Sequence, residues 1–580
     1  MNIDIHQEAT FRYLLEIKKY LKQNPIRSIK SKEYGTMVNL LYIIEHLSDT
    51  PNTENDYKSL YTQLHEAADT IAKYELLSKR RKNNSPLDGL FIKLFENDSN
   101  IHDFIAKNVL PKEGDRTSTG VQANLQQNTT APSALWDITH PDNKLNAFFC
   151  SMLGLFDYNP LKRNNVPYVA FNEKQLQQDK KCLRIGAQTQ DANVVNPSFE
   201  RYLLANTRKE TKARDEDKDY DYDYVYISLL KRNETSQNTQ KSYFSQLLDR
   251  FVRFSEGSRA SSLEALNEKE DLKTAVISLP ADNEYLERSF SMDTGSGNNA
   301  SRPQSLEAIL NDLKDNIKHN RNDFYFSDKV KAKLFGKRCD NGKIEKLFSQ
   351  AAQEILGAQA KGSMSKVFLN DEQRTALLFH FIKSNLTSHI LKTLDPKAYN
   401  ITCKDAIDRG GIHTLWYHME LMHKKGTPLS EVEFFKYLDT PAMIVKYRPL
   451  NHNRNLLWNV LKHRMESDVS FRESHPWAVD WLLNNAPSGQ PDFSFNPQKD
   501  IKKIKSDKGI KKANNQRAIN AIKKAPAVKL EDVFATFSNK KPVLIPAFQS
   551  QKAFCKIIYA QTASSKQFRR VSCRKAVSAA

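Results

Sequence analysis

The chain has 580 residues, of which 39% are hydrophobic and 27% charged, so it is long enough for two to four domains with buried cores. This composition excludes a disordered protein, and no apolar run approaches the length of a membrane-spanning helix. The six cysteines lack paired spacing, which argues against a disulfide framework and indicates reduced thiols in a cytosol. The N-terminus lacks the features of a secretory signal, so we expect any export to use another route.

The net charge of +19 is concentrated near the C-terminus. Residues 499–580 contain 20 Lys and Arg against 4 Asp and Glu, a net charge of +16, which leaves +3 for the first 498 residues. Isoleucines stand among the lysines of residues 499–529, as in a basic amphipathic helix, which favours an anionic membrane surface as partner. The alternative is a solvated charged linker. Nucleic acid is not expected as a partner, because the tail has few aromatic residues to stack on bases.

The first part of the chain predicts helices. Apolar residues recur at three- and four-residue spacing in residues 34–47 and 57–77. The polar residues 111–133 predict a long surface loop or linker. We therefore expect a helical N-terminal region that spans residues 1–134.

Strand signals follow at residues 166–171, 222–230 and 274–280, where β-branched and aromatic residues are concentrated. The polar stretch near 172–222 predicts an exposed insertion. Its acidic end, residues 215–224, lacks the glycine and the closing glutamate of a calcium loop, so we expect no metal there.

A second polar linker, at residues 291–304, is followed by sequence that predicts mostly helices. Asn370 has the position of a helix cap, and Asp395-Pro396 should end the helix that Asn370 begins.

The stretch "YNITCKDAIDRGGI" at residues 399–412 carries the chemistry. A short strand should end at Thr402, and an amphipathic helix should begin at Gly410 or Gly411, so Cys403 follows a strand and precedes a helix. Loop N–H groups and the positive end of a helix stabilise anions, including a thiolate. Among the six cysteines, only Cys403 is followed six residues later by an arginine, Arg409. This pattern predicts a nucleophile that attacks phosphorus; the alternative is a buried thiol before a helix.

The other residues of the loop have matching chemistry. Arg409 can hold two phosphate oxygens with its planar guanidinium, and Lys404 adds a positive charge. Asp405 or Asp408 can protonate the leaving oxygen or orient Arg409.

The sequence CKDAIDR resembles the loops of phosphoinositide phosphatases, such as the inositol-polyphosphate 4-phosphatases and the myotubularins. Together with "AVISLPADNEYL" (275–286) and "PAMIVKYRPLNHNRNLLW" (441–458), it is most similar to the secreted phosphoinositide 3-phosphatases of intracellular bacterial pathogens, of the SidP and SidF type. The resemblance covers residues 140–470. It implies removal of the D3 phosphate of phosphatidylinositol 3-phosphate or 3,5-bisphosphate by an effector that is secreted into the host cytosol and is peripheral on membranes.

Two positions depart from the wider pattern. Gly410 stands where tyrosine phosphatases and the 4-phosphatases carry Ser or Thr, whose hydroxyl helps the thiolate to leave in the second step. Ile407 replaces the second lysine of the 4-phosphatase loop, which favours a less phosphorylated lipid. The predicted substrate-binding residues are loop positions and basic residues beyond the loop, for which a surface role is the alternative: Lys404, Ala406, Ile407, Gly410, Lys446, Arg448 and Arg454.

The sequence therefore predicts an α/β fold, with a cysteine-phosphatase-like central sheet flanked by helices in residues 135–495, and a helical basic C-terminal module in residues 496–580. Neither a metal nor another cofactor is expected, because His413, His418 and His423 are spaced too far around a helix to share a face. The alternatives are a protein tyrosine or inositol-phosphate phosphatase and a non-catalytic scaffold that binds membranes.

Overall fold

A computed structural model describes most of the first 494 residues, in one compact unit that spans Met1–Lys524. A second unit, Ala525–Ala580, and the predicted basic module at 496–580 lie outside the described residues. The described residues are 4–24, 34–51, 56–77, 87–111, 117–129, 165–173, 180–190, 194–210, 222–232, 256–281, 283–286, 304–337, 339, 341–450, 453–486 and 493–494.

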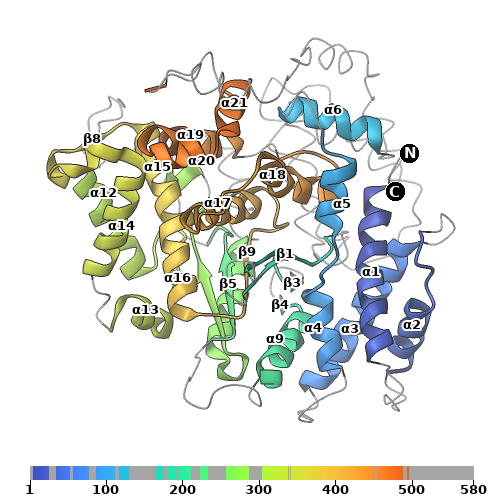
Figure 1. Ribbon diagram of the computed structural model, residues 1–580. Helices are drawn as coiled ribbons and strands as arrows, with labels where there is room; N and C mark the ends of the chain where they lie inside the picture. Colours follow the sequence, from blue (N-terminus) through green and yellow to red (C-terminus); the bar gives the residue numbers. More distant parts are fainter. Residues whose placement is uncertain are drawn as a thin grey trace, which may run out of the picture. The chain divides into compact units, whose positions relative to one another are not determined.

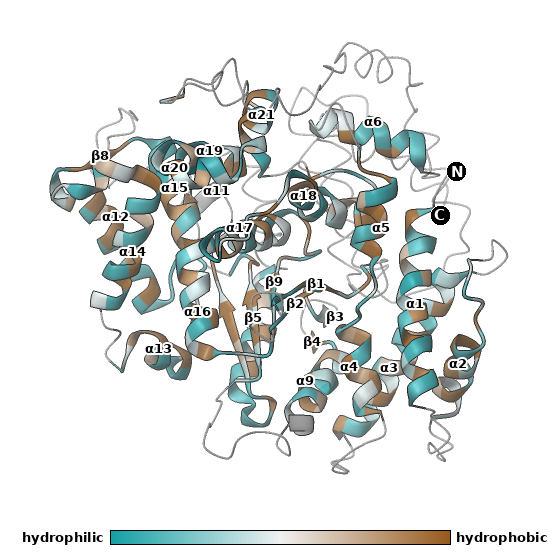
Figure 2. Ribbon diagram, in the orientation of Figure 1, coloured by the Kyte–Doolittle hydropathy of each residue, from teal (hydrophilic) through white to brown (hydrophobic). Residues whose placement is uncertain are grey.

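The fold is mixed α/β, with a five-stranded sheet flanked by helices (Figure 1). The strand order is β1-β2-β9-β5-β6; β1 and β2 are antiparallel, and the other neighbours are parallel. Every residue of β5, β6 and β9 is buried, as expected for parallel strands that are covered on both faces. In Figure 2, brown segments stand in the strands of the sheet, whereas the helices around it carry both brown and teal segments. The strands are β1 (Tyr168–Asn172), β2 (Lys181–Arg184), β5 (Tyr224–Ser228), β6 (Thr274–Ser278) and β9 (Ala398–Thr402).

Three strand predictions are confirmed by β1, β5 and β6, and the short strand before Cys403 is confirmed by β9. The polar stretch near 172–222 differs from its prediction, because it contains β2, a neighbour of the central strand, and the helix α9 (Pro197–Glu210). Polar residues surround the four-residue β2, so its strand signal is weak. Two further pairs of short strands are β3 (Thr189–Gln190) with β4 (Val194–Val195), and β7 (Gln304–Ser305) with β8 (Phe368–Leu369).

The N-terminal helices share one hydrophobic core with the sheet. The residues after α4 cover the edge of the sheet, where the carbonyl of Asn97 accepts a hydrogen bond from the Val169 N–H of β1 (2.9 Å). The predicted loop at 111–133 contains a helix, α6, which Thr117 caps by accepting a hydrogen bond from the Gly120 N–H. The six helices are α1 (Ile5–Gln23), α2 (Gly35–Glu45), α3 (Tyr57–Leu77), α4 (Asp88–Phe95), α5 (Ile101–Asn108) and α6 (Ser118–Asn128).

The helix that follows Asn370 is confirmed, and Asn370 forms a capping box with Gln373. The helix ends at Leu394 because Asp395 adopts the left-handed conformation (φ 45°). It is not uniform: α15 (Asp371–His380) and α16 (Thr387–Leu394) are joined by a π-helical segment, Phe381–Leu386.

The remaining helices complete the layers around the sheet. Residues 256–264 are helical and precede two 3₁₀ turns, Ala265–Glu268 and Glu270–Leu272. Two more 3₁₀ turns are Gly357–Lys361 and Met364–Lys366. The other helices are α11 (Asn283–Leu286), α12 (Leu306–His319), α13 (Asp328–Phe335), α14 (Asn341–Leu356), α17 (Asp408–Lys424), α18 (Glu431–Lys446), α19 (Arg454–Ser467), α20 (Val469–Ser474) and α21 (Trp477–Asn484). Of the helices described, none is both long and apolar enough to cross a membrane.

Several histidines are buried in this core, and two of them pair with tyrosine hydroxyls. His65 of α3 accepts or donates a hydrogen bond with the Tyr13 hydroxyl (3.0 Å), and His418 of α17 pairs in the same way with Tyr399 (2.9 Å). Burial lowers the pKa of each imidazole to about 3. Both rings are therefore neutral in the folded protein at pH 5, whereas the unfolded chain protonates them below about pH 6.5.

The folded state should therefore lose stability as the pH falls. Between pH 7 and pH 5, the unfolded state takes up protons that the folded state does not, so each of these histidines lowers the free energy of unfolding by about 2 kcal/mol. Urea titrations at the two pH values should show a pH dependence smaller by about this amount in His65→Gln than in the wild type. The matched control is His46→Gln, at an exposed histidine; equal pH dependence in His65→Gln and the wild type would contradict the assignment.

Candidate active site

The loop at 403–407 lies at the carboxyl end of the central strand. β9 pairs with β2 on one side and with β5 on the other, and all three strands run parallel. The carboxyl ends of parallel strands are where open α/β sheets usually bind ligands. The helix α17 begins directly after the loop, at Asp408, two residues before the earlier of the predicted starts. Asp408 and Arg409 therefore belong to the first turn of α17.

Segments that follow the neighbouring strands hold the loop on both sides. After β5, the Leu229 N–H donates to the carbonyl of Thr402 (2.8 Å). After β2, the Ala187 N–H donates to the carbonyl of Lys404 (2.9 Å), and the carbonyl of Ile185 accepts from the Thr402 hydroxyl (2.6 Å). These contacts fix the start of the loop to three adjacent strands.

The peptide carbonyl of Asp405 is held by two side chains that the sequence analysis did not identify. The Arg184 guanidinium donates to it at 3.0 Å and the Asn165 amide at 3.1 Å, and Arg184 also donates to the Asn165 side-chain oxygen (2.8 Å). The next residue, Ala406, has a left-handed backbone (φ 53°), which is rare for a residue other than glycine and persists where neighbours hold it. Arg184 and Asn165 therefore support the turn in the loop.

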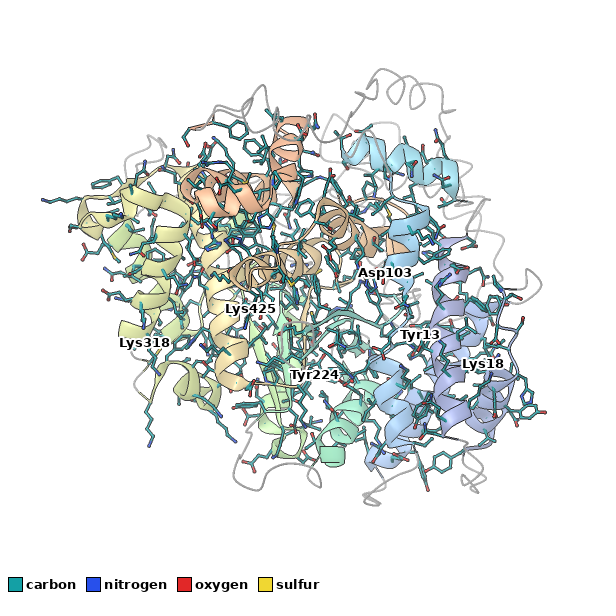
Figure 3. All side chains as sticks on the ribbon, viewed as in Figure 1. Tyr13, Lys18, Asp103, Tyr224, Lys318 and Lys425 are labelled. Atoms are coloured by element: carbon teal, nitrogen blue, oxygen red, sulfur yellow. The ribbon has the colours of Figure 1, made fainter. Side chains whose placement is uncertain are left out.

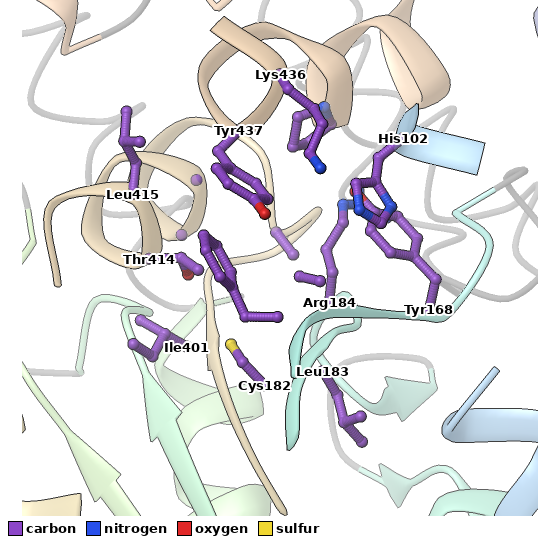
Figure 4. Close-up of a pocket in the computed structure, with 16 residues that line it drawn as sticks. His102, Tyr168, Cys182, Leu183, Arg184, Ile401, Thr414, Leu415, Lys436 and Tyr437 are labelled. Atoms are coloured by element: carbon purple, nitrogen blue, oxygen red, sulfur yellow. The ribbon is translucent and has the colours of Figure 1, made fainter. Parts of the chain in front are cut away.

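A small cavity lies behind the loop, between β1, β2, α17 and α18. Its volume is about 30 Å³, which is enough for one or two water molecules. In Figure 4, Arg184, Lys436 and His102 lie on one side of it and Ile401 and Cys182 on the other. The cavity is too small for a phosphorylated substrate.

The accessible side of the loop carries its charged residues. Cys403 is 5% exposed, and Ala406, Ile407 and Gly410 are also buried. The predicted contacts of these last three residues with a substrate can therefore come only from the backbone. The partly exposed loop residues are Lys404, Asp405, Asp408 and Arg409.

Arg409 and Asp408 each have an oppositely charged partner. The Arg409 guanidinium donates to both carboxylate oxygens of Glu256 (3.0 and 2.6 Å), and Glu256 also accepts from the Lys231 N–H (2.9 Å). Arg448 donates to both carboxylate oxygens of Asp408 (3.0 and 2.9 Å). The planes of both arginines are therefore fixed at the start of α17.

The basic residues beyond the loop divide into two groups. Lys446 lies beside the loop, with its ammonium group 3.4 Å from the Asp405 carboxylate, and Arg448 contacts Asp408. Arg454 is buried and instead donates to Asp439 (3.3 Å) and to the carbonyl of Leu450 (2.9 Å). The described contacts of Arg454 support the turn after α18 and not the loop.

The histidines of α17 point to separate partners, as their spacing predicts. His413 contacts the Thr387 hydroxyl (2.8 Å), His418 contacts Tyr399 (2.9 Å) and His423 contacts Ser474 (3.1 Å). Across the part of the chain that the structure describes, no group of three or more His, Cys, Asp or Glu side chains is arranged to hold a metal ion. Burial raises the pKa of Cys182, another thiol of this region, so Cys182 is a poor nucleophile.

Gly410 allows the first turn of α17 to approach β9. A Cβ atom at this position would lie 3.0 Å from the carbonyl oxygen of Ile401 and 3.3 Å from the Cys403 nitrogen. Both neighbours are backbone atoms, which cannot move away as a flexible side chain can. A side chain at this position, such as the hydroxyl residue that tyrosine phosphatases carry, would therefore crowd the backbone of β9 and of the loop.

Comparisons of the chain with protein-family models, with curated proteins and with solved structures gave no match.

The two adjacent glycines of α17 allow a matched test of the packing. Gly410→Ala should lower the free energy of unfolding by about 1–3 kcal/mol, because the methyl group overlaps backbone atoms. Gly411→Ala should be neutral or stabilising by up to ~1 kcal/mol, since alanine favours the helix and its Cβ would meet only a Leu450 methyl group at 3.8 Å. Urea unfolding measures both, and equal stabilities of the two variants would contradict the close approach.

Proposed function

We propose that the protein is a cysteine-dependent phosphoinositide phosphatase. One observation carries this proposal: Cys403 follows directly after the central parallel strand, and Arg409, six residues later, stands in the first turn of the helix that follows. In this arrangement the positive end of α17 and the N–H groups of the loop favour both a thiolate and a bound phosphate group. The described residues supply no metal site at the loop, and the proposed chemistry needs none.

The reaction has two steps. The Cys403 thiolate attacks phosphorus, the bond between phosphorus and the inositol oxygen breaks, and a carboxylic acid gives its proton to that oxygen. Water then attacks the phosphocysteine, the same carboxylate takes a proton from the water, and inorganic phosphate and the thiolate are released. Arg409 would stabilise the negative charge of the transition state with its planar guanidinium, held in place by Glu256.

Asp405 is the better candidate for the acid. Both oxygens of Asp408 accept hydrogen bonds from Arg448, so neither oxygen can easily carry a proton for the leaving group. The Asp405 carboxylate is also partly exposed, and the Lys446 ammonium group lies 3.4 Å from it. We therefore assign Asp405 as the proton donor and Asp408 as a residue that positions the first turn of α17.

The substrate class rests on the resemblance of the CKDAIDR loop. It favours the D3 phosphate of phosphatidylinositol 3-phosphate or 3,5-bisphosphate, with Lys404 and Lys446 as cations for the lipid headgroup. Membrane attachment through the basic residues 499–580, and action as a secreted effector in a host cytosol, belong to the same proposal. The alternatives are a protein tyrosine or inositol-phosphate phosphatase and a non-catalytic scaffold.

Phosphate release from a panel of substrates tests the proposal. The panel contains soluble phosphatidylinositol phosphates, a phosphotyrosine peptide and inositol phosphates, each with and without EDTA. We expect the 3-phosphorylated lipids to be hydrolysed fastest, equally with and without EDTA. Cys403→Ser should lose turnover, because a hydroxyl is a much weaker nucleophile than a thiolate near neutral pH. Wild-type rates in Cys403→Ser would remove Cys403 from this role, and an inactive wild type would favour the scaffold.

The two aspartates can be separated by their leaving-group dependence. On a phosphoinositide, Asp405→Asn should lower kcat by roughly 10² to 10⁴, and the loss should shrink on an aryl phosphate whose leaving group needs no proton. Asp408→Asn should lower the rates on both substrates by similar factors, since Asp408 supports the loop in either reaction. The opposite pattern would assign the proton to Asp408, and a substrate-independent loss in both variants would place the acid on another segment.

A further inference from the structure

The turn after α18 brings two basic residues to the loop from either side of one tyrosine. Lys446 is the last residue of α18, and its ammonium group lies 3.4 Å from Asp405. Arg448 follows two residues later and holds Asp408 at 2.9 Å. Tyr447 between them has a left-handed backbone (φ 49°, ψ 38°), which ends the helix and reverses the direction of the chain.

A left-handed tyrosine needs support from its surroundings, because its Cβ atom crowds the backbone in this conformation. The Tyr447 N–H donates to the carbonyl of Met443 (3.1 Å), which closes the last turn of α18. The side chain is held by a part of the chain more than 400 residues earlier: its hydroxyl donates to the Asp4 carboxylate (3.2 Å), and its ring lies 4.0 Å from the His6 ring, centroid to centroid.

Asp4 is itself fixed by the helix that it starts. The carboxylate oxygen that accepts from Tyr447 also accepts from the backbone N–H groups of His6 (3.0 Å) and Gln7 (3.1 Å), so it caps α1. Burial raises the pKa of Tyr447, so its hydroxyl remains a hydrogen-bond donor. One oxygen atom therefore joins the start of α1 to the turn that carries Lys446 and Arg448.

We propose that Asp4 and His6, in the first turn of α1, are positioning residues of the active site, which act through Tyr447 on Lys446 and Arg448. This inference rests on the proposed phosphatase function and gives the N-terminal helical region a role in it. The N-terminal helices then do more than cover the sheet, since they determine where two cations stand beside the phosphate-binding loop. A purely structural role would require only that Tyr447 be buried, whereas positioning requires its hydrogen bond to Asp4.

The test removes single hydrogen bonds from the full-length protein. Tyr447→Phe deletes the donor to Asp4 and keeps the ring, and Asp4→Ala deletes the acceptor. The matched control is Tyr13→Phe in α1, the helix that Asp4 caps (Figure 3); this substitution also deletes one buried hydroxyl. The Tyr13 hydroxyl bonds to His65 (3.0 Å) and to the carbonyl of Leu94 (2.8 Å), away from the turn at Tyr447.

Two measurements separate positioning from stability. On dibutanoyl phosphatidylinositol 3-phosphate, Tyr447→Phe and Asp4→Ala should raise KM by about three- to tenfold with kcat within about twofold of the wild type, and Tyr13→Phe should change neither. Hydrogen exchange followed by mass spectrometry should show faster exchange of residues 403–412 and 444–450 in the first two variants only. This second measurement needs no activity, so it tests the connection even if the wild type hydrolyses no phosphoinositide.

The outcomes are distinct. Wild-type KM and wild-type exchange of the loop in Tyr447→Phe would overturn the inference, and so would equal effects in Tyr447→Phe and Tyr13→Phe. Faster exchange of the loop in Tyr447→Phe, in a protein whose wild type is inactive on every phosphorylated substrate, would support the connection between α1 and the loop and overturn the phosphatase assignment instead.

Discussion

The contact between the first turn of α17 and the end of β9 determines the geometry of the whole loop. Because Gly410 has no side chain, the first turn of α17 can lie where a Cβ atom would come within 3.0 Å of the Ile401 carbonyl oxygen and 3.3 Å of the Cys403 nitrogen. The five residues between Cys403 and Arg409 must then close a tight turn, and Ala406 adopts a left-handed backbone within it. The partial positive charge at the start of α17 consequently lies close to this loop.

The loop is held by parts of the chain that are far apart in sequence. Glu256 binds Arg409, Arg448 binds Asp408, and Arg184 binds the carbonyl of Asp405. Each contact places one group of the loop before any ligand arrives. Such preorganisation makes a site effective, because its dipoles and charges need not reorient when charge develops on a bound phosphate group.

The strand before Cys403 and the strands around it could be predicted from the sequence, because their signals are local. The strand before Cys403, the cap at Asn370 and the strands at β5 and β6 depend on residues within a few positions of one another. The four-residue β2 has too few apolar residues to give a strand signal, although it is a neighbour of the central strand. β2 is placed in the sheet by its pairing with β9, and no local sequence pattern indicates this long-range pairing.

The supporting residues of the site could not be predicted for the same reason. Nothing near Glu256 or Arg184 indicates that either side chain meets the loop, since the contacts arise from the order of the strands. Arg454 shows the opposite case. Its spacing from the loop is compatible with a role in substrate binding, but its guanidinium instead forms an ion pair with the buried carboxylate of Asp439. Lys446 and Arg448 both reach the loop because Tyr447, which stands between them, reverses the direction of the chain.

The strand order also has a consequence for biosynthesis. β9 lies between β2 and β5, and both of these partners leave the ribosome more than 170 residues before it. Until then, the pair of β1 and β2 and the pair of β5 and β6 each expose an open edge, with backbone N–H and C=O groups that lack a strand partner. The nascent chain therefore presents strand edges that are prone to aggregation, and accessible to chaperones, until β9 has been synthesised, since the strand that closes the sheet is the one directly before Cys403.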